Sequence, residues 1–193
     1  MERELILTGI GGQGVQLAAA VVARAAVLEG REAQVFGNFA GMMRGGATES
    51  TVVLADGPIA SPPTVGSTWS AVLMHDAHAA PVVSRLLDTG VVFVNTSVVD
   101  PGSVDTPATV VGVDATDLAL SVGGMLVASM VMIGAYAAAT GMVDLASLEA
   151  ASRASLPSYR ARHADLNDLA LRAGFHAVAA GSTPAWLDPI GAP

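Results

Sequence analysis

The sequence predicts an α/β fold of the Rossmann-like type, in which helices flank a mostly parallel sheet. Two observations carry this prediction: short apolar runs alternate with helical segments, and a glycine-rich turn directly follows the first run. The chain of 193 residues is long enough for one sizeable core and short for two. We therefore expect a single domain over residues 1–181, followed by a proline-rich tail over residues 182–193.

The first part of the chain predicts a βαβ unit. Residues 4–9 (ELILTG) are a short apolar run, and residues 13–29 form a helix with little charge. Residues 33–37 (AQVFG) predict a second strand, joined to the first by a right-handed crossover in a parallel sheet. Residues 50–56 (STVVLAD) predict a third strand, and the GPIASPP turn after it indicates an antiparallel hairpin that interrupts the parallel pattern.

Strands and helices alternate again further along. We predict strands at 71–76, 90–95 and 108–115, and helices at 77–88, 118–139, 144–154 and 157–180. Residues 118–139 carry no charge and are long enough to cross a bilayer, but acidic residues flank them and no arginine lies near either end. Their many small residues favour a helix buried in the protein, without a membrane span.

Composition limits the function. The chain has nine arginines, no lysine and seventeen acidic residues, for a net charge of −8, which argues against a general nucleic-acid or anionic-membrane surface. Only 13% of the residues are charged and 52% are hydrophobic, so we expect part of the surface to meet a protein partner. Because there is no cysteine, the chain cannot itself supply thiol nucleophiles or thiolate ligands for iron–sulfur clusters.

Two further features bear on location and metals. The N-terminal residues MERELIL lack the basic start and cleavable apolar core of a secretory signal, so we expect a cytoplasmic protein. The four histidines repeat no metal-ligand spacing apart from the HDAH stretch at 75–78, where a solvated loop is favoured over a metal site. We predict no catalytic residue and no metal site in this chain.

The glycine turn after the first run is the first candidate site. Gly9, Gly11 and Gly14 fit the dinucleotide pattern G-x-G-x-x-G between a strand and a helix. A dinucleotide fold also needs an acidic residue at the tip of the second strand, but this strand ends at Gly37 and is followed by Asn38. The NAD interpretation therefore loses its second support, and Gln13 at the first helical turn offers an amide for another ligand.

The second candidate site is the stretch GMMRGGATES at residues 41–50. Arg44 precedes Gly45 and Gly46, which sets a bidentate cation beside approachable backbone, as in a phosphate or carboxylate clamp. Both glycine loops follow strands of the same βαβ unit, so we expect them on the same edge of the sheet. Ligands of open α/β folds bind at that edge.

These motifs together carry a family resemblance. GIGGQGV after the first strand, MRGG with Ser50 four residues beyond it, the IASP stretch at 59–62, VFVN ending in Asn95, and VASMVMIGAYAAATG at 127–141 appear in this order. In order and spacing they resemble the gamma subunit of 2-oxoacid:ferredoxin oxidoreductases, which act on pyruvate, 2-oxoglutarate, branched-chain ketoacids or indolepyruvate. The resemblance runs from about residue 4 to about residue 180.

The resemblance implies a role inside a hetero-oligomeric complex. Such complexes decarboxylate a 2-oxoacid on thiamine diphosphate, pass electrons through iron–sulfur clusters to ferredoxin, and transfer the acyl group to coenzyme A. The gamma domain binds neither the thiamine nor the clusters, which lie on partner subunits, and it is associated with assembly and with the coenzyme A side of the active site. The matching positions imply cofactor-binding residues in the two loops, namely Gly11, Gly12, Gln13, Gly14, Arg44, Gly45 and Gly46.

The chain also departs from the family. Ser129 stands where an asparagine is usual, which puts in doubt any polar contact assigned there, and NFAGMM at 38–43 lacks the tyrosine and proline common in pyruvate-type members. The 2-oxoacid is therefore open. Two other functions also stay open: a self-contained NAD(P)-dependent dehydrogenase of Rossmann type, and a free-standing module that binds a coenzyme A ester.

Overall fold

A computed structural model describes residues 1–39, 45–62, 64–156 and 163–186 of the chain. It contains a six-stranded sheet with the strand order β2-β3-β1-β4-β5-β6. The strands are β1 (Glu2–Ile10), β2 (Glu32–Phe39), β3 (Ala47–Ala55), β4 (Thr68–Leu73), β5 (Leu86–Asn95) and β6 (Thr109–Val113). The helices are α1 (Val15–Leu28), α2 (Ala80–Val83), α3 (Ala115–Val122), α4 (Ala128–Thr140), α5 (Leu145–Ser155) and α6 (Ala164–His176). The predicted fold class, a mostly parallel sheet flanked by helices, is confirmed.

The order of the first three strands differs from the prediction. β3 lies between β1 and β2 and pairs antiparallel with both, with Ile10 opposite Ala47 and Phe39 opposite Thr48. β1 and β2 point the same way, as a crossover through α1 requires, but the prediction that they are neighbours is wrong. β3 is an almost wholly buried inner strand, and β2 is the edge strand.

The antiparallel hairpin exists, but its predicted place is wrong. It is formed by β2 and β3 across the MRGG stretch, and the GPIASPP segment leads on to β4, which runs parallel to β1. A short glycine-rich connection suits a hairpin, because two neighbouring antiparallel strands need few residues to join them. A parallel neighbour would need a longer crossover.

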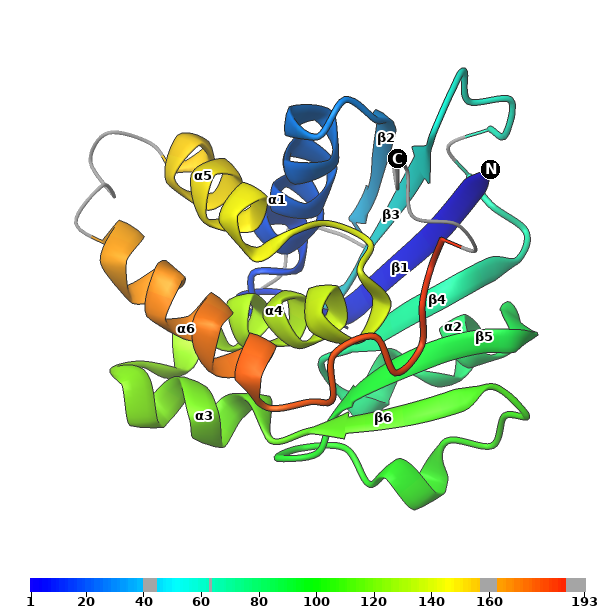
Figure 1. Cartoon of the computed structure of the whole chain (residues 1–193). Helices are drawn as coiled ribbons and strands as arrows, with labels where there is room; N and C mark the ends of the chain where they lie inside the picture. The colour runs from blue at the N-terminus through cyan, green and yellow to red at the C-terminus, as the bar shows by residue number, and fades with distance from the viewer. Residues whose placement is uncertain (40–44, 63, 157–162, 187–193) are drawn as a thin grey trace.

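The two faces of the sheet are covered unequally. The longer helices gather on one face of the sheet (Figure 1). The core cluster on this side includes Leu5, Val72 and Phe93. On the other face, α2 and the connections around it cover a smaller cluster that includes Ile6, Leu73 and Val94. The sheet therefore has a thick helical side and a thin side.

α4 is the centre of the helical side. All thirteen of its residues are buried, and Tyr136 contacts the ring of Phe93 edge-on at 5.3 Å between centroids and the Ser70 hydroxyl at 3.0 Å. The prediction that this segment is buried is confirmed for α4, but the prediction of one continuous helix over residues 118–139 is wrong. Gly123, with φ of +129°, ends α3, and a short 3₁₀ turn (Met125–Val127) precedes α4. In the described part of the chain, no helix combines the length and apolarity that a bilayer crossing requires.

α6 crosses α4 at close range, and two glycines make this possible. A Cβ atom added to Gly134 would collide with the Leu171 carbonyl, and one added to Gly174 would collide with the Val131 carbonyl. The backbones of the two helices therefore touch at positions where no side chain intervenes. The predicted helix at 157–180 is shorter in the structure, and its residues 157–162 lie outside the described residues.

The predicted helix at 77–88 is also wrong in extent. The chain forms a 3₁₀ turn (Asp76–His78) and the one-turn helix α2, and β5 already begins at Leu86. A register shift between β4 and β5 accompanies this early start, since Thr68 pairs with Leu86 but Ser70 pairs with Val91. The HDAH stretch therefore follows β4 as a turn at the carboxyl end of the strand.

The first residues of the tail pack on the domain. The amides of Gly181, Thr183 and Ala185 donate to the carbonyls of Ala138, Ala139 and Thr140 at 2.8–3.0 Å, which satisfies the last carbonyls of α4. The Trp186 indole donates to the Met142 carbonyl at 3.3 Å, and the Arg31 guanidinium lies 4.8 Å from its ring.

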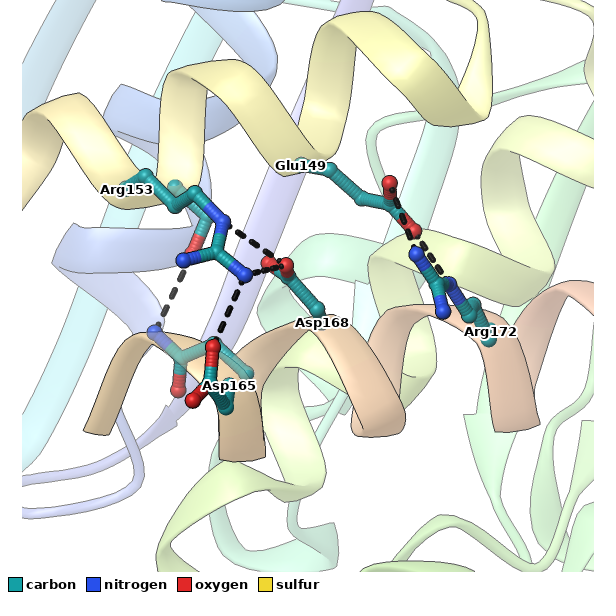
Figure 2. Close-up of polar contacts among 7 residues, drawn as sticks. Glu149, Arg153, Asp165, Asp168 and Arg172 are labelled. Carbon is teal, nitrogen blue, oxygen red and sulfur yellow. Dashed lines mark hydrogen bonds and ion pairs between the residues drawn. The ribbon is translucent and has the colours of Figure 1, made fainter. Parts of the chain in front are cut away.

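Ion pairs join α5 to α6 on the helical side (Figure 2). Arg153 on α5 binds both Asp165 and Asp168 on α6, at 2.9 and 2.5 Å, and Arg172 on α6 binds Glu149 on α5 at 2.6 Å. The Asp168 side chain is only 7% exposed, whereas Arg153 is half exposed. Burial raises the pKa of the Asp168 carboxyl above its ordinary value, although Arg153 acts in the opposite direction.

Candidate functional site

The two glycine loops lie at the carboxyl ends of β1 and β2. The glycine turn, defined here as Gly11–Gly14, leaves β1 and leads into α1, and Gly45 and Gly46 lead into β3. Because β1 and β2 both pair antiparallel with β3, their carboxyl ends share one edge of the sheet. The prediction that both loops share an edge is therefore confirmed, although an antiparallel strand separates β1 from β2.

A backbone hydrogen bond joins the two loops. The Gly11 amide donates to the Gly46 carbonyl at 2.9 Å, one residue beyond the last paired residues, Ile10 and Ala47. The bond extends the β1–β3 ladder into the loops, so the two segments form one continuous surface. We call Gly11–Gly14 with Gly45 and Gly46 the two-loop edge.

The Gln13 side chain lies inside this edge. Its Oε1 accepts a hydrogen bond from the Ile10 amide at 2.9 Å, and its Nε2 donates to the Met74 carbonyl, just after β4, at 3.1 Å. Both ends of the carboxamide are therefore bonded to neighbouring backbone. The side chain bridges the ends of β1 and β4 in addition to any contact with a ligand.

Three glycines of the edge have backbone conformations that side chains rarely adopt. Gly12, Gly14 and Gly45 have φ values of +105°, +78° and +83°. A Cβ atom on Gly12 or Gly45 would meet nothing within 4 Å, so the backbone there is approachable, whereas one on Gly14 would lie 2.6 Å from the Ser129 hydroxyl of α4. Both the backbone conformation and the close packing against α4 therefore require glycine at position 14.

The electrostatics of the edge favour an anion. Gly14 is the N-terminal cap of α1, no described side chain caps this end, and no acidic residue lies in the first turn of the helix. The positive end of the helix dipole therefore faces the loops without an acidic neighbour in that turn. Backbone amides beside positive-φ glycines are a further source of anion-binding donors.

The arginines of the described ranges are engaged elsewhere. Each makes a hydrogen bond or ion pair with a protein group, and the six are Arg3, Arg24, Arg31, Arg85, Arg153 and Arg172. Arg44, the predicted cation of the site, lies outside the described residues. It directly precedes Gly45 in the sequence.

Apolar side chains flank the glycine turn. Met125 and Leu126, in the connection between α3 and α4, are 60% and 77% exposed, and Leu120 at the end of α3 is 56% exposed. The Leu126 carbonyl lies 4.0 Å from the position of a Cβ on Gly14, so the connection that carries Met125 and Leu126 passes beside the turn. Three large apolar side chains so exposed mark a surface suited to a protein partner.

A separate pocket lies at the end of β6. It has a volume of about 380 Å³ and is lined in part by Asp114, Asp117 and Ser121. At the neighbouring end of β5, the buried Asn95 binds Thr116 through both ends of its amide and ties the strand to α3. The pocket and Asn95 belong to the β5–β6 side of the sheet, and no sequence-predicted site residue lines the pocket.

The structure therefore brings together six of the seven predicted binding residues and leaves the seventh, Arg44, outside its described part. Sequence reasoning missed the partners of this cluster, namely Met74, which receives the Gln13 amide, and Ser129, which packs against Gly14. The family pattern had marked Ser129 only as a departure from asparagine. Nothing in the sequence around Met74 signals its contact, because the contact uses the backbone carbonyl.

The fold and the two-loop edge define an α/β domain of the Rossmann-like class with an open, glycine-lined ligand edge. Residues 4–177 match the sequence profile of the pyruvate ferredoxin/flavodoxin oxidoreductase family. The chain is 33% identical over 157 residues to the pyruvate synthase subunit PorC of Methanosarcina barkeri, which covers 79% of this chain and 85% of that protein. The chain therefore belongs to the pyruvate ferredoxin/flavodoxin oxidoreductase family, and the predicted resemblance is confirmed.

Solved structures agree with this assignment. The gamma subunit of a keto/oxoacid ferredoxin oxidoreductase from Geobacter sulfurreducens superposes with a TM-score of 0.78 and 27% identity, over 92% of this chain and 96% of that one. The 2-oxoglutarate:ferredoxin oxidoreductase of Magnetococcus marinus, solved with 2-oxoglutarate, coenzyme A and succinyl-CoA, has a TM-score of 0.80 over 91% of this chain. At 13% identity and 30% coverage of that longer chain, the second likeness shows the fold alone.

Proposed function

We propose that this chain is the gamma subunit of a thiamine diphosphate-dependent 2-oxoacid:ferredoxin oxidoreductase complex, where it supports assembly and forms part of the coenzyme A side of the active site. Family membership supports the reaction class. The observation that carries the role of this chain is the Gly11–Gly46 bond, which unites two approachable glycine loops into one edge.

The chemistry of the edge suits coenzyme A. The ligand carries phosphate groups, and the edge offers the uncapped N-terminus of α1 and glycine backbone that a ligand can approach closely. Arg44 would add a bidentate cation beside Gly45. The structural neighbour from Magnetococcus marinus, with coenzyme A and succinyl-CoA, is consistent with this choice of ligand.

The remaining parts of the reaction belong to partner subunits in this proposal. Thiamine diphosphate and the iron–sulfur clusters would lie on those subunits, with ferredoxin as the electron acceptor and the cytoplasm as the location. The apolar patch of Leu120, Met125 and Leu126 beside the glycine turn is the surface we assign to a partner subunit. It would place the partner's active site next to the two-loop edge.

The geometry offers less to an NAD(P)-dependent dehydrogenase. A dinucleotide of a Rossmann fold lies in the crevice at the carboxyl ends of the strands, beside the glycine turn. Such a fold also uses an acidic residue at the tip of the second strand for the ribose, and β2 ends in Gly37, Asn38 and Phe39. Titration calorimetry of the chain with NADH should therefore show no binding.

The variant Arg44→Ala tests the proposed function. In the complex reconstituted with its thiamine-binding and cluster-binding subunits, we expect acyl transfer to coenzyme A to weaken by about tenfold or more, since loss of a charge-assisted pair costs roughly 1.5–3 kcal/mol. Reduction of the complex by the 2-oxoacid without coenzyme A should stay intact. Arg172→Ala, at an exposed ion pair on α6, is the matched control. An unchanged coenzyme A dependence in Arg44→Ala would rule out the ligand assignment.

A further inference from the structure

We infer that Gln13 is a positioning residue, which holds the glycine turn on the ends of β1 and β4 so that the backbone of the turn is preformed for its ligand. The inference deepens the proposed function and rests on it for the identity of the ligand. It differs from the sequence-based expectation, in which Gln13 itself contacts the cofactor.

Gln13 bridges β1 and β4 at the switch point of the sheet. After β1 the chain turns into α1 on the thick helical side, and after β4 it turns into α2 on the thin side. β1 and β4 are parallel neighbours, with Thr8 opposite Leu73, and the Met74 amide donates to the Thr8 carbonyl at 2.9 Å. Beyond this last backbone bond the strands separate. There the Gln13 carboxamide supplies the next link, from the Ile10 amide to the Met74 carbonyl.

The carboxamide is held tightly. A Cβ atom on Gly9 would collide with Gln13 Oε1 and would lie 2.9 Å from the Met74 Cβ, so Gly9 leaves just enough space for the side chain. With one end accepting and the other donating, a carboxamide of this length satisfies both backbone partners at once. The side chain therefore fixes where the turn begins relative to β4.

Because the start of the turn is fixed, the position of Gly12 is restricted as well. Gly12 is exposed, and a Cβ atom there would meet nothing within 4 Å. Its neighbours are held by the Gly11–Gly46 bond on one side and by Gln13 on the other, where the Gln13 amide donates to the Ile10 carbonyl at 3.2 Å and the Gln13 side chain accepts from the Ile10 amide. Holding backbone amides in place before binding lowers the entropic cost of binding, which is how a residue that does not contact the ligand affects affinity.

Gln16, one helical turn later, is the natural comparison. Its Nε2 donates to the Glu49 carbonyl at 3.1 Å, the same kind of bond and length that Gln13 makes to Met74. Gln16 fastens α1 to β3 and makes no bond to the glycine turn. Replacement of either glutamine by glutamate removes one amide donor to a strand carbonyl, so the pair separates positioning of the turn from general stability.

The test uses the full chain and the reconstituted complex with three variants: Gln13→Leu, Gln13→Glu and the control Gln16→Glu. Hydrogen exchange measured by NMR should show the hydrogen-bonded amides of the turn, those of Ile10, Gly11 and Gln13, exchanging about tenfold faster in Gln13→Leu, as expected for the net loss of roughly one to two hydrogen bonds. Gln13→Glu keeps the acceptor for Ile10 but loses the donor, so its exchange should be intermediate and should slow again at acidic pH after correction for the intrinsic rate, when a protonated carboxyl can donate. Gln16→Glu should leave exchange at these three amides unchanged.

In the complex, Gln13→Leu should raise the KM for coenzyme A with little change in kcat, and reduction by the 2-oxoacid alone should be unaffected. Exchange at the Ile10, Gly11 and Gln13 amides that is unchanged, or that rises only in step with global unfolding, would overturn the inference even if Arg44→Ala weakens acyl transfer. A third outcome is faster exchange at the turn in Gln13→Leu together with an unchanged KM for coenzyme A in both Gln13→Leu and Arg44→Ala. That result would still support the positioning role of Gln13. That result would instead remove coenzyme A as the ligand, which is a failure of the proposed function.

Discussion

The Gly11 amide and the Gly46 carbonyl, on loops that follow different strands, are joined by a hydrogen bond of 2.9 Å. The bond continues the β1–β3 pairing by one step beyond Ile10 and Ala47. Because of this bond, the positions of the glycine turn and of the start of β3 are coupled, and a substitution in one loop should alter the backbone of the other. The two-loop edge is therefore one unit of the molecule, and its individual contacts can be tested.

The contact between Gly14 and Ser129 gives the first prediction. Gly14→Ala introduces both a strained φ of +78° and a clash, since the new Cβ would lie 2.6 Å from the Ser129 hydroxyl. We expect a loss of about 2–4 kcal/mol in the free energy of unfolding from strain and overpacking together. Gly12→Ala, where nothing lies within 4 Å, should cost only the strain, roughly 1–2 kcal/mol.

A double-mutant cycle separates the two contributions at Gly14. Ser129→Ala removes the hydroxyl that the new methyl group would meet, while the Ser129 Cβ is 3.6 Å away and stays in ordinary contact. The loss in Gly14→Ala should therefore shrink by about 1 kcal/mol or more in the Ser129→Ala background, as measured by chemical denaturation. Strict additivity of the two changes would show that the hydroxyl does not limit this position.

The sequence predicted the strands and the place of the glycine loops better than it predicted strand order. Apolar runs such as 50–56 identify a buried strand, but hydrophobic pattern does not state which neighbour that strand pairs with, so β3 was not expected between β1 and β2. The helix at 118–139 was predicted as one piece because its charge-free composition masks the break at Gly123 and Gly124. In both cases the missing information is tertiary.

The candidate site shows the same division. Gly11, Gly12 and Gly14 could be predicted, because a strand followed by glycines and a helix has a specific local meaning. The bridge that Gln13 forms between β1 and β4 could not be predicted, because its partner Met74 is 61 residues away. Met74 accepts through its backbone carbonyl, which every residue type has, so the sequence does not indicate the contact.

The crossing of α4 and α6 gives the second prediction. Gly134→Ala and Gly174→Ala each force a methyl group into the backbone of the other helix, so each should cost about 3 kcal/mol or more or prevent folding. Gly66→Ala is a matched control, because Gly66 has no atom within 4 Å of its Cβ position and no positive φ. Thermal unfolding of the three variants measures the difference. A control variant that unfolds as early as the other two would contradict the packing explanation.

The buried carboxylate of Asp168 gives the third prediction. Its pKa is raised by burial, so the folded chain holds the proton more tightly than the unfolded chain does, and this residue's contribution to stability falls as pH rises from the ordinary aspartate pKa through the raised one. Arg153→Ala removes the cation that opposes this shift, so an NMR titration of the Asp168 carboxyl should give a still higher pKa in the variant. The pH-dependent loss of stability should become larger, because it continues up to the higher pKa of the variant.

The two arginines of the α5–α6 ion pairs should also differ in how much each contributes to the stability of the folded chain. Arg153→Ala leaves a carboxylate that is 7% exposed without its cation, and we expect a loss of about 1–3 kcal/mol in the free energy of unfolding at neutral pH. Arg172→Ala breaks an ion pair whose arginine is 55% exposed, and should cost about 0–1 kcal/mol. Equal losses in the two variants would show that burial of Asp168 does not set the strength of the pair.

We propose that the two-loop edge completes a coenzyme A site only when partner subunits are present. The decisive experiment is calorimetric titration of coenzyme A into the assembled complex, into the complex carrying Arg44→Ala, and into the isolated chain. We predict binding by the wild-type complex, at least about tenfold weaker binding by the variant complex, and no measurable binding by the isolated chain. Binding of equal strength in both complexes would contradict the assignment of the edge, and tight binding by the isolated chain would identify it as a free-standing coenzyme A module.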